Sequence, residues 1–231
     1  MVTVTVGGQA GAGGLEVGSH IARLIEARYV HHLALRKIAR RLNATVSAVA
    51  HKELSFSSRW AALLSYVEVA FSRMPWHGMH PAAMPIYVWP VEAPDRKEFA
   101  AEISDRDYVA ATYETAAELA GQGRLVIAKR AGCLTLRDVP HAVHVGLFAS
   151  KHARVLRMAD RLDVGYLDAS QVLASLEKAR KAWYRKLGGP EPDDPALFHV
   201  RVTTDFDKSD QQSARRVLEA VREIHPGLAA A

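Results

Sequence analysis

The sequence predicts an α/β protein with a central parallel sheet and helices on both of its faces. Three observations predict this class: a β-branched segment opens the chain, a glycine-rich turn follows it directly, and short apolar segments then alternate with helical segments. Strands that alternate with helices are typical of parallel sheets, because each parallel strand pair needs a long crossover connection.

The expected elements follow from the spacing of the apolar residues. Alternating Val and Thr predict a first strand at residues 1–6, and Val17, Ile21 and Leu24 share one face of a helix expected at residues 15–28. Further strands are expected at residues 125–128, 144–148 and 198–203. Further helices are expected at residues 33–47, 58–73, 105–120, 151–162, 169–187 and 209–224.

A proline-rich segment interrupts this alternation at residues 75–95. It holds half of the chain's ten prolines, together with Trp76 and Trp89. Proline at this density breaks helices and interior strands. We interpret the segment as a long structured loop inserted into a single domain of residues 1–231.

Composition and charge exclude several classes of protein. Apolar residues make up 49% and charged residues 24% of the 231 residues, which is typical of a globular protein and unlike a disordered or collagen-like chain. Cys133 is the single cysteine and cannot form an internal disulfide. No apolar run is long enough to span a membrane, and no secretory leader is recognised, so a cytoplasmic location is expected. The net charge of +5 suits an anionic ligand, either nucleic acid or nucleotide phosphates.

The glycine-rich turn is a candidate phosphate site. Backbone N–H groups of such a loop point into a concavity, and the following helix N-terminus adds partial positive charge. The pattern G-x-x-x-x-G-K-[ST] is met at Gly8 and Gly13, but Gly14 stands in place of the lysine and Leu15 in place of the hydroxyl residue. A tight turn with close packing of helix and strand is the alternative interpretation.

The same loop carries a family resemblance. The chain reads Gly11-Ala12-Gly13-Gly14-Leu15-Glu16-Val17, which resembles Gly-Ser-Gly-Gly-Arg-Glu-Ile in the cytidylate kinase-like family, relatives of the nucleoside monophosphate kinases. The family loop already lacks the lysine, and Leu15 replaces the Arg that is a stand-in for it. The resemblance implies that Glu16 helps to hold Mg²⁺, with complementation of the helix dipole as the alternative role.

Two further segments resemble the family along the chain. The chain reads Val126-Ile127-Ala128-Lys129-Arg130-Ala131-Gly132 where the family reads Val-Ile-Val-Gly-Arg-Gly-Gly, which implies that Arg130 contacts the acceptor monophosphate. Tyr29-Val30-His31 corresponds to Phe-Tyr-Asp, so that His31 stands in place of an acidic residue.

The region of residues 151–190 resembles the helical lid of these kinases. Arg154 and Arg157 have the usual spacing, and Glu177, Arg180 and Trp183 fit the family's acidic-x-x-Arg-x-x-aromatic pattern. The stricter cytidylate kinase pattern, Arg-Asp-x-x-Asp-x-x-Arg, falls on residues 178–185, where both acidic positions hold alanine and Arg185 ends the pattern. A solvated basic helix face is the alternative interpretation of these arginines.

The resemblance implies a P-loop NTPase-like three-layer sandwich with a helical lid and a monophosphate-binding insert. The implied reaction is ATP- and Mg²⁺-dependent phosphorylation of a nucleoside monophosphate, with CMP or dCMP as the leading acceptor. The implied cofactor-binding residues are Gly8, Gly11, Ala12, Gly13, Gly14, Leu15 and Glu16, with Glu16 also the metal ligand. The implied substrate-binding residues are Arg130, His31 and Arg36, and the implied catalytic residues are Arg130, Arg154, Arg180 and Arg185.

Two other functions remain open from the sequence. The departures at Leu15, Lys129, His31 and the two lid alanines are also what a nucleotide-binding pseudokinase would show, acting as a sensor or partner-binding module. Binding of nucleic acid through the basic surface ranks last, because no nucleic-acid motif supports it. A homodimer is compatible with the sequence, which does not decide the oligomeric state.

Overall fold

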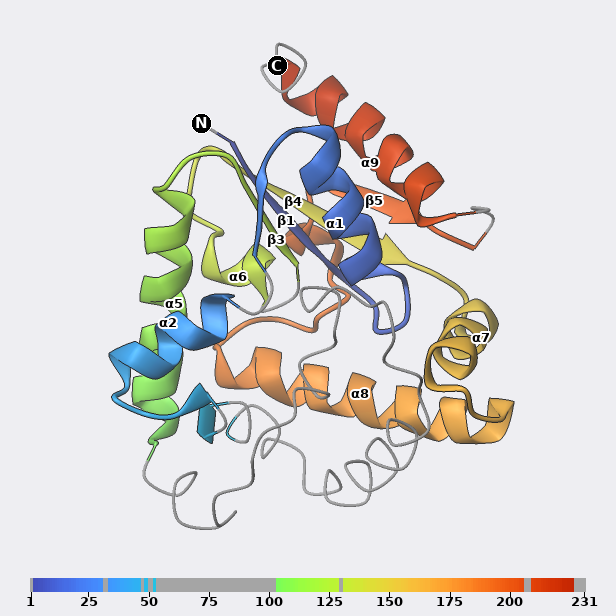
Figure 1. Ribbon diagram of the computed structural model, residues 1–231, viewed down its shortest axis with the longest axis horizontal. Coiled ribbons are helices and arrows are strands. Elements are labelled where there is room, and N and C mark those ends of the chain that lie inside the picture. Colours follow the sequence, from blue (N-terminus) through green and yellow to red (C-terminus); the bar gives the residue numbers. More distant parts are fainter. Residues whose placement is uncertain are drawn as a thin grey trace, which may run out of the picture.

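The computed structural model describes residues 2–30, 33–46, 48–49, 52, 103–128, 131–205 and 209–226. The helix expected at residues 58–73 and the proline-rich loop at residues 75–95 lie outside these ranges. Within them, the chain forms one five-stranded parallel sheet (Figure 1). Its strand order is β2-β3-β1-β4-β5. The strands are β1 (Thr3–Gly8), β2 (Arg28–Val30), β3 (Leu125–Ala128), β4 (Ala142–Phe148) and β5 (Val200–Thr203).

Helices cover both faces of the sheet. On one face lie α1 (Gly14–Leu24) and α9 (Asp210–Ile224), which also pack against each other. Contacts on the other face are made by α5 (Asp105–Ala120) and the short α6 (Gly132–Thr135), and α2 (Leu33–Arg41) packs on α5. A pair formed by α7 (Lys151–Leu162) and α8 (Tyr166–Lys186) follows β4, and a 3₁₀ turn, η3 (Pro195–Leu197), precedes β5. No described helix has the length and apolar composition needed to cross a membrane.

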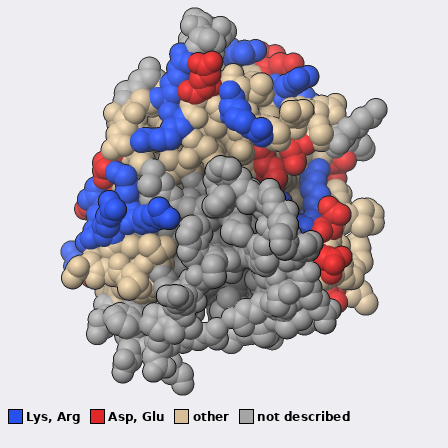
Figure 2. All heavy atoms as spheres, viewed as in Figure 1, with Lys and Arg blue, Asp and Glu red and all other residues tan. Residues whose placement is uncertain are grey.

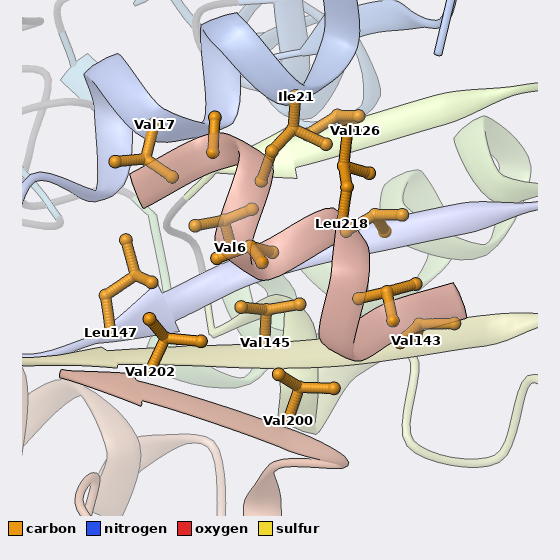
Figure 3. Close-up of a cluster of buried hydrophobic side chains, with 14 of the residues drawn as sticks. Val6, Val17, Ile21, Val126, Val143, Val145, Leu147, Val200, Val202 and Leu218 are labelled. Atoms are coloured by element: carbon orange, nitrogen blue, oxygen red, sulfur yellow. The ribbon is translucent and has the colours of Figure 1, made fainter. Parts of the chain in front are cut away.

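The main core lies between the sheet and the pair α1 and α9. Alternate residues of the central strands point into it, and Figure 3 shows them together with apolar side chains of α1 and α9. The labelled members are Val6, Val17, Ile21, Val126, Val143, Val145, Leu147, Val200, Val202 and Leu218. The alternate positions of the same strands are buried on the opposite face, Thr5 and Ile127 among them. Burial on both faces is what keeps the strands of a parallel sheet apolar throughout.

The structure confirms the α/β class and most of the expected elements. The bounds of α5, β3 and α7 match the expected ranges. The first helix is shorter than expected, because the chain turns after Leu24, with Glu26 at a φ of 49°, and pairs Arg28–Val30 with β3 as an edge strand. The first strand has the expected six residues but lies two positions later, at Thr3–Gly8, because it pairs with β4 as far as Gly8.

His144 is a buried titratable residue in the middle of β4. It is 3% exposed, its Nδ1 lies 2.9 Å from the Thr5 hydroxyl oxygen, and its ring stacks on that of His199. Burial, with a smaller effect from His199, lowers the pKa of His144 to about 4. The folded protein therefore disfavours the protonated form of this side chain.

The free energy of unfolding is expected to fall in mild acid because of His144. The unfolded chain binds a proton near pH 6.5 and the folded chain only near pH 4, so the contribution of His144 is complete above about pH 6.5 and is lost below it. The loss approaches about 1.4 kcal/mol per pH unit, or about 3 kcal/mol in all. Urea unfolding between pH 7.5 and 4 measures it.

The matched variants are His144→Asn and His152→Asn. The first removes the buried ring and should reduce the slope, although His20 and His199, whose pKa values are also lowered, leave part of it. The second changes an exposed histidine of α7 and should keep the wild-type slope. An unchanged slope in His144→Asn would contradict the assignment.

Candidate functional site

The glycine loop, residues 8–13, runs from the last residue of β1 to the N-cap of α1 at the carboxyl edge of the sheet, the edge where ligands bind in open α/β folds. Glycine is required at two positions of this loop. Gly8 has a φ of 98°, and a Cβ there would lie 2.1 Å from the carbonyl oxygen of Leu147. Gly11 has a φ of 79°, and a Cβ there would lie 3.0 Å from the carbonyl oxygen of Arg154. The loop backbone therefore lies so close to β4 and α7 that a side chain at Gly8 or Gly11 would clash with them.

The carboxylate of Asp210 lies near the start of α1, with its Oδ1 3.4 Å from where a Cβ on Gly13 would stand, but it does not cap the helix. Gly13 is its N-cap in the left-handed conformation, and no side chain of the described residues caps the helix. Tyr29 donates a 2.8 Å hydrogen bond from its hydroxyl to the carbonyl oxygen of Leu15, which ties the first turn to β2. Uncapped first-turn N–H groups and the helix dipole together favour a phosphate at this end.

Two arginines reach the loop from outside it. Arg154 of α7 donates from Nη1 to the carbonyl oxygen of Ala10 at 3.2 Å and from Nε to that of Ala149 at 3.1 Å. Arg180 of α8 donates from Nη1 to the carbonyl oxygen of Gly8 at 2.7 Å. In Figure 1, α8 runs across the side of the sheet where the strands end, which brings its side chains to the loop. These arginines place two guanidinium groups beside a loop that has no lysine.

Glu177 of α8 joins both arginines to the loop. Its Oε1 accepts from Nη1 of Arg154 at 2.6 Å and from the backbone N–H of Ala10 at 3.1 Å. Its Oε2 accepts from Nε and Nη2 of Arg180 at 2.9 and 2.7 Å, and Arg180 also bonds Asp193 at 2.7 Å. Burial by itself would lower the pKa of Arg180, but the charges of Glu177 and Asp193 raise it. The guanidinium groups are thus held in a network that is largely shielded from water.

Glu16 has one carboxylate oxygen in an ion pair and one without a partner. Oε1 pairs with Arg161 of α7, and Oε2 is buried with no hydrogen-bond partner among the described residues. Asp210, at the start of α9, has its pKa raised by burial and by the charge of Glu16. A buried, unpartnered carboxylate oxygen beside the loop suits Mg²⁺, which prefers oxygen ligands. Within the described part of the chain, no three His, Cys, Asp or Glu residues are grouped as a protein-only metal site.

A cavity of about 600 Å³ opens beside the loop. Its lining residues come from the loop, the β4–α7 turn and β5: Gln9, Phe148, Ala149, Ser150, Arg201, Thr203 and Asp205. The guanidinium of Arg201 lies 4.6 Å from the centre of the Phe148 ring, and the backbone N–H of Ser150 donates to the Asp205 carboxylate. The volume lies in the range of small-ligand sites.

The structure brings together only some of the predicted site residues. Arg154 and Arg180 contact the glycine loop. The loop and the start of α1 contain the predicted cofactor-binding residues Gly8, Gly11, Ala12, Gly13, Gly14, Leu15 and Glu16. Arg185 is exposed on α8, and no contact between it and the loop is seen among the described residues. Arg130 and His31, predicted for substrate binding, lie outside the described residues. Their roles stay predictions.

Arg36 lies on α2, in a basic group of residues whose neighbours are paired with α5. Lys37 forms an ion pair with Glu118, and Arg41 bonds Glu114 and Glu118 at 2.9 and 2.7 Å. Figure 2 shows Lys and Arg side chains gathered at the left of this face, where Figure 1 draws α2. The ion pairs explain much of this basic face as packing of α2 on α5. The substrate-binding role of Arg36 stays a prediction.

Sequence reasoning missed three residues that hold the loop. The Gln9 side chain accepts from the backbone N–H of Ala149 at 3.1 Å and donates to Asp193 at 3.2 Å. The Thr204 hydroxyl donates to the carbonyl oxygen of Ala12 at 3.2 Å and accepts from Arg157 at 3.0 Å. Thr204 could have been predicted, because polar residues at the carboxyl end of a strand often line a site. Nothing in the sequence near Gln9 or Asp193 indicates that these two residues contact each other.

The family model for the cytidylate kinase-like family matches residues 3–206, which is most of the chain. The chain belongs to the cytidylate kinase-like family. A cytidylate kinase from Thermoplasma acidophilum is 28% identical over 104 residues, which are 45% of this chain and 55% of that relative. The match to this curated relative therefore spans about half of its length.

Several solved structures are similar to this cytidylate kinase-like protein. An uncharacterized protein from Eubacterium ventriosum matches with a TM-score of 0.62 at 12% identity, over 96% of this chain and 98% of that one. Shikimate kinase from Acinetobacter baumannii in complex with shikimate matches with a TM-score of 0.48 at 15% identity, over 97% and 95% of the chains. The parallel sheet, the glycine loop and the family membership together establish the expected α/β P-loop kinase-like fold.

Proposed function

We propose that this protein transfers the terminal phosphoryl group of ATP to a nucleoside monophosphate, with CMP and dCMP as the preferred acceptors. Membership of the cytidylate kinase-like family supports a nucleotide kinase function. The observation that carries the proposal is the pair of guanidinium groups, from Arg154 and Arg180, that donate to carbonyl oxygens of the lysine-less loop. A site of this kind meets the main demand of phosphoryl transfer, which is positive charge at a fixed position.

The donor phosphates would lie against the loop and the first turn of α1. The N–H groups that no side chain caps would hold the phosphate oxygens, and the α1 dipole would favour their charge. Arg154 and Arg180 would hold the transferring group from the α7 and α8 side. In this arrangement a guanidinium from another helix takes over the part of the loop lysine.

Glu16 is the residue that would contact Mg²⁺ in this arrangement. Its unpartnered Oε2 fits a hard cation beside the phosphates, while its Oε1 stays with Arg161. A Mg²⁺ ion held by Glu16 would supply positive charge that stabilises the transferring phosphoryl group. Arg161 would orient the Glu16 carboxylate for this contact.

The cavity beside the loop would take the base of the donor nucleotide. It begins at Gln9 and extends to β5, so that a base inside it could be linked to phosphates in the loop. The Arg201 guanidinium and the Asp205 carboxylate offer a donor and an acceptor to the edges of a base. The acceptor monophosphate is assigned to Arg130 on the family resemblance alone.

The test is release of ADP from ATP and Mg²⁺, measured with each common ribo- and deoxyribonucleoside monophosphate in turn. We expect turnover with CMP or dCMP, and its loss in Arg130→Ala with the melting temperature unchanged. Arg137→Ala is the matched control, since Arg137 is two-thirds exposed and pairs only weakly with Asp138. Turnover without a preference for CMP or dCMP would overturn the acceptor assignment but not the proposed kinase activity.

The absence of turnover with every acceptor would overturn the kinase proposal. ATP binding without turnover would then favour the pseudokinase, whose departures at Leu15 and in the lid remove charge from functional positions. Binding of neither ATP nor any monophosphate, with affinity for RNA that falls steeply with salt, would favour the nucleic-acid alternative.

A further inference from the structure

The Glu177 carboxylate lies among hydrogen-bond donors at the glycine loop. It accepts a backbone N–H of the loop, from Ala10, and the guanidinium groups of Arg154 and Arg180. One loop amide and two guanidinium groups around an anion are the donors that proteins use to bind phosphate. In the structure, the carboxylate of this chain's own α8 satisfies them.

The two arginines do not depend on Glu177 for their position at the loop. Arg154 also donates to the carbonyl oxygens of Ala10 and Ala149, and Arg180 also donates to that of Gly8. Both guanidinium groups therefore stay beside the loop if the carboxylate moves away. An incoming phosphate would meet the same donors, with more negative charge than one carboxylate carries.

The side chains in this contact are withdrawn from water, which makes the competition matter. The exposed fractions are 12% for Arg154, 14% for Arg180 and 21% for Glu177. Ion pairs that are shielded from water are screened less than surface pairs. The Glu177 carboxylate therefore competes strongly with a phosphate for the two arginines, and its removal should raise the affinity for phosphate.

We propose that Glu177 is an intramolecular phosphate mimic that blocks the loop until the nucleotide displaces it. The inference rests on the proposed function, because it takes the loop as the donor phosphate site. Glu177 would lower the affinity of the protein for the phosphate chain of the nucleotide. Nucleotide binding would then require the Glu177 carboxylate to move away from the loop. The cost of displacement would disfavour weakly charged anions over a triphosphate.

Calorimetric binding of inorganic tripolyphosphate to the full chain tests this directly, because the probe has neither base nor sugar. We expect Glu177→Gln to bind tripolyphosphate about tenfold more tightly than the wild type, since the amide keeps the size of the side chain but not its charge. Glu191→Gln is the matched control: it removes one charge from the loop after α8, where Glu191 pairs with the exposed Lys181. Its affinity should equal that of the wild type.

A second variant covers the case in which Glu177→Gln does not fold. Glu177→Asp keeps the charge that pairs with the arginines but withdraws the carboxylate from Ala10 by one methylene, and should bind the probe several-fold more tightly. Equal or weaker affinity in both Glu177 variants would overturn the inference while leaving the kinase proposal intact. No binding of the probe by any folded variant, the wild type included, would overturn the donor site itself and both proposals with it.

Discussion

Replacement of Arg180 by glutamine is expected to lower kcat for nucleoside monophosphate phosphorylation by about 100-fold or more. Loss of one preorganised charge-stabilising donor costs about 10²- to 10³-fold in kcat, and no lysine in the loop can take its place. Arg180→Lys should lie between the variant and the wild type, because an ammonium cannot make the paired bonds to Glu177 and reach Gly8 together. Steady-state rates at saturating ATP and CMP measure the effect.

The matched control is Lys181→Gln, the next residue on α8. Lys181 is half exposed and pairs with Glu191 at 3.1 Å, away from the loop contacts. Its kcat should stay within about twofold of the wild type. Because Arg180→Gln also leaves Glu177 and Asp193 short of a partner, each rate is compared at a temperature where thermal unfolding shows the variant fully folded. A kcat in folded Arg180→Gln equal to that of the control would remove Arg180 from the proposed chemistry.

Replacement of Gly8 by alanine is expected to lower the free energy of unfolding by about 3 kcal/mol or more, as overpacking and backbone strain combine. Gly8 has a φ of 98°, and its new Cβ would lie 2.1 Å from the carbonyl oxygen of Leu147. That oxygen accepts the N–H of Gln9 at 2.9 Å, so the clash cannot be relieved without moving the loop. Chemical denaturation measures the change, and affinity for tripolyphosphate should fall with it.

Gly123→Ala separates the two causes of this loss. Gly123 has a φ of 111°, similar to that of Gly8, but a Cβ there has no atom within 4 Å. The variant should therefore cost only the backbone term, about 1 to 2 kcal/mol. Equal losses in the two variants would show that the contact with Leu147 contributes nothing and that conformation alone requires glycine in β1.

The local features of the fold could be predicted from the sequence. The bounds of α5, β3 and α7 follow from apolar spacing and capping, since Ser104 and Ser150 cap α5 and α7 through their hydroxyls. The glycine loop is likewise a local feature, since a run of glycines between a strand and a helix predicts it, and the positive φ angles found there are ones that few other residues tolerate. The three-residue β2 was missed, because its pairing with β3 and not its own pattern makes it a strand.

The candidate site was only partly predictable. Arg154 and Arg180 were found through the family resemblance, but nothing in their local sequence shows that both donate to the loop. Arg185 was chosen by the same reasoning, and it is exposed on α8. Arg180 and Arg185 are five positions apart on α8, which places their side chains on different sides of the helix. The surface against which one side of α8 packs is far away in the sequence, so the local sequence does not show which arginine faces the loop.

The identity of the elements, their order and the presence of a lysine-less glycine loop are determined by residues close together in the chain. The chemical environment of that loop is determined by tertiary contacts. Ala10 is separated by 144 positions from Arg154 and by 167 from Glu177, and Gly8 by 172 from Arg180. Only the packing of α7 and α8 against the carboxyl edge of the sheet closes these distances. Apolar spacing and backbone preference act over a few residues, whereas the charge at a site is the sum over whatever the folded chain brings there.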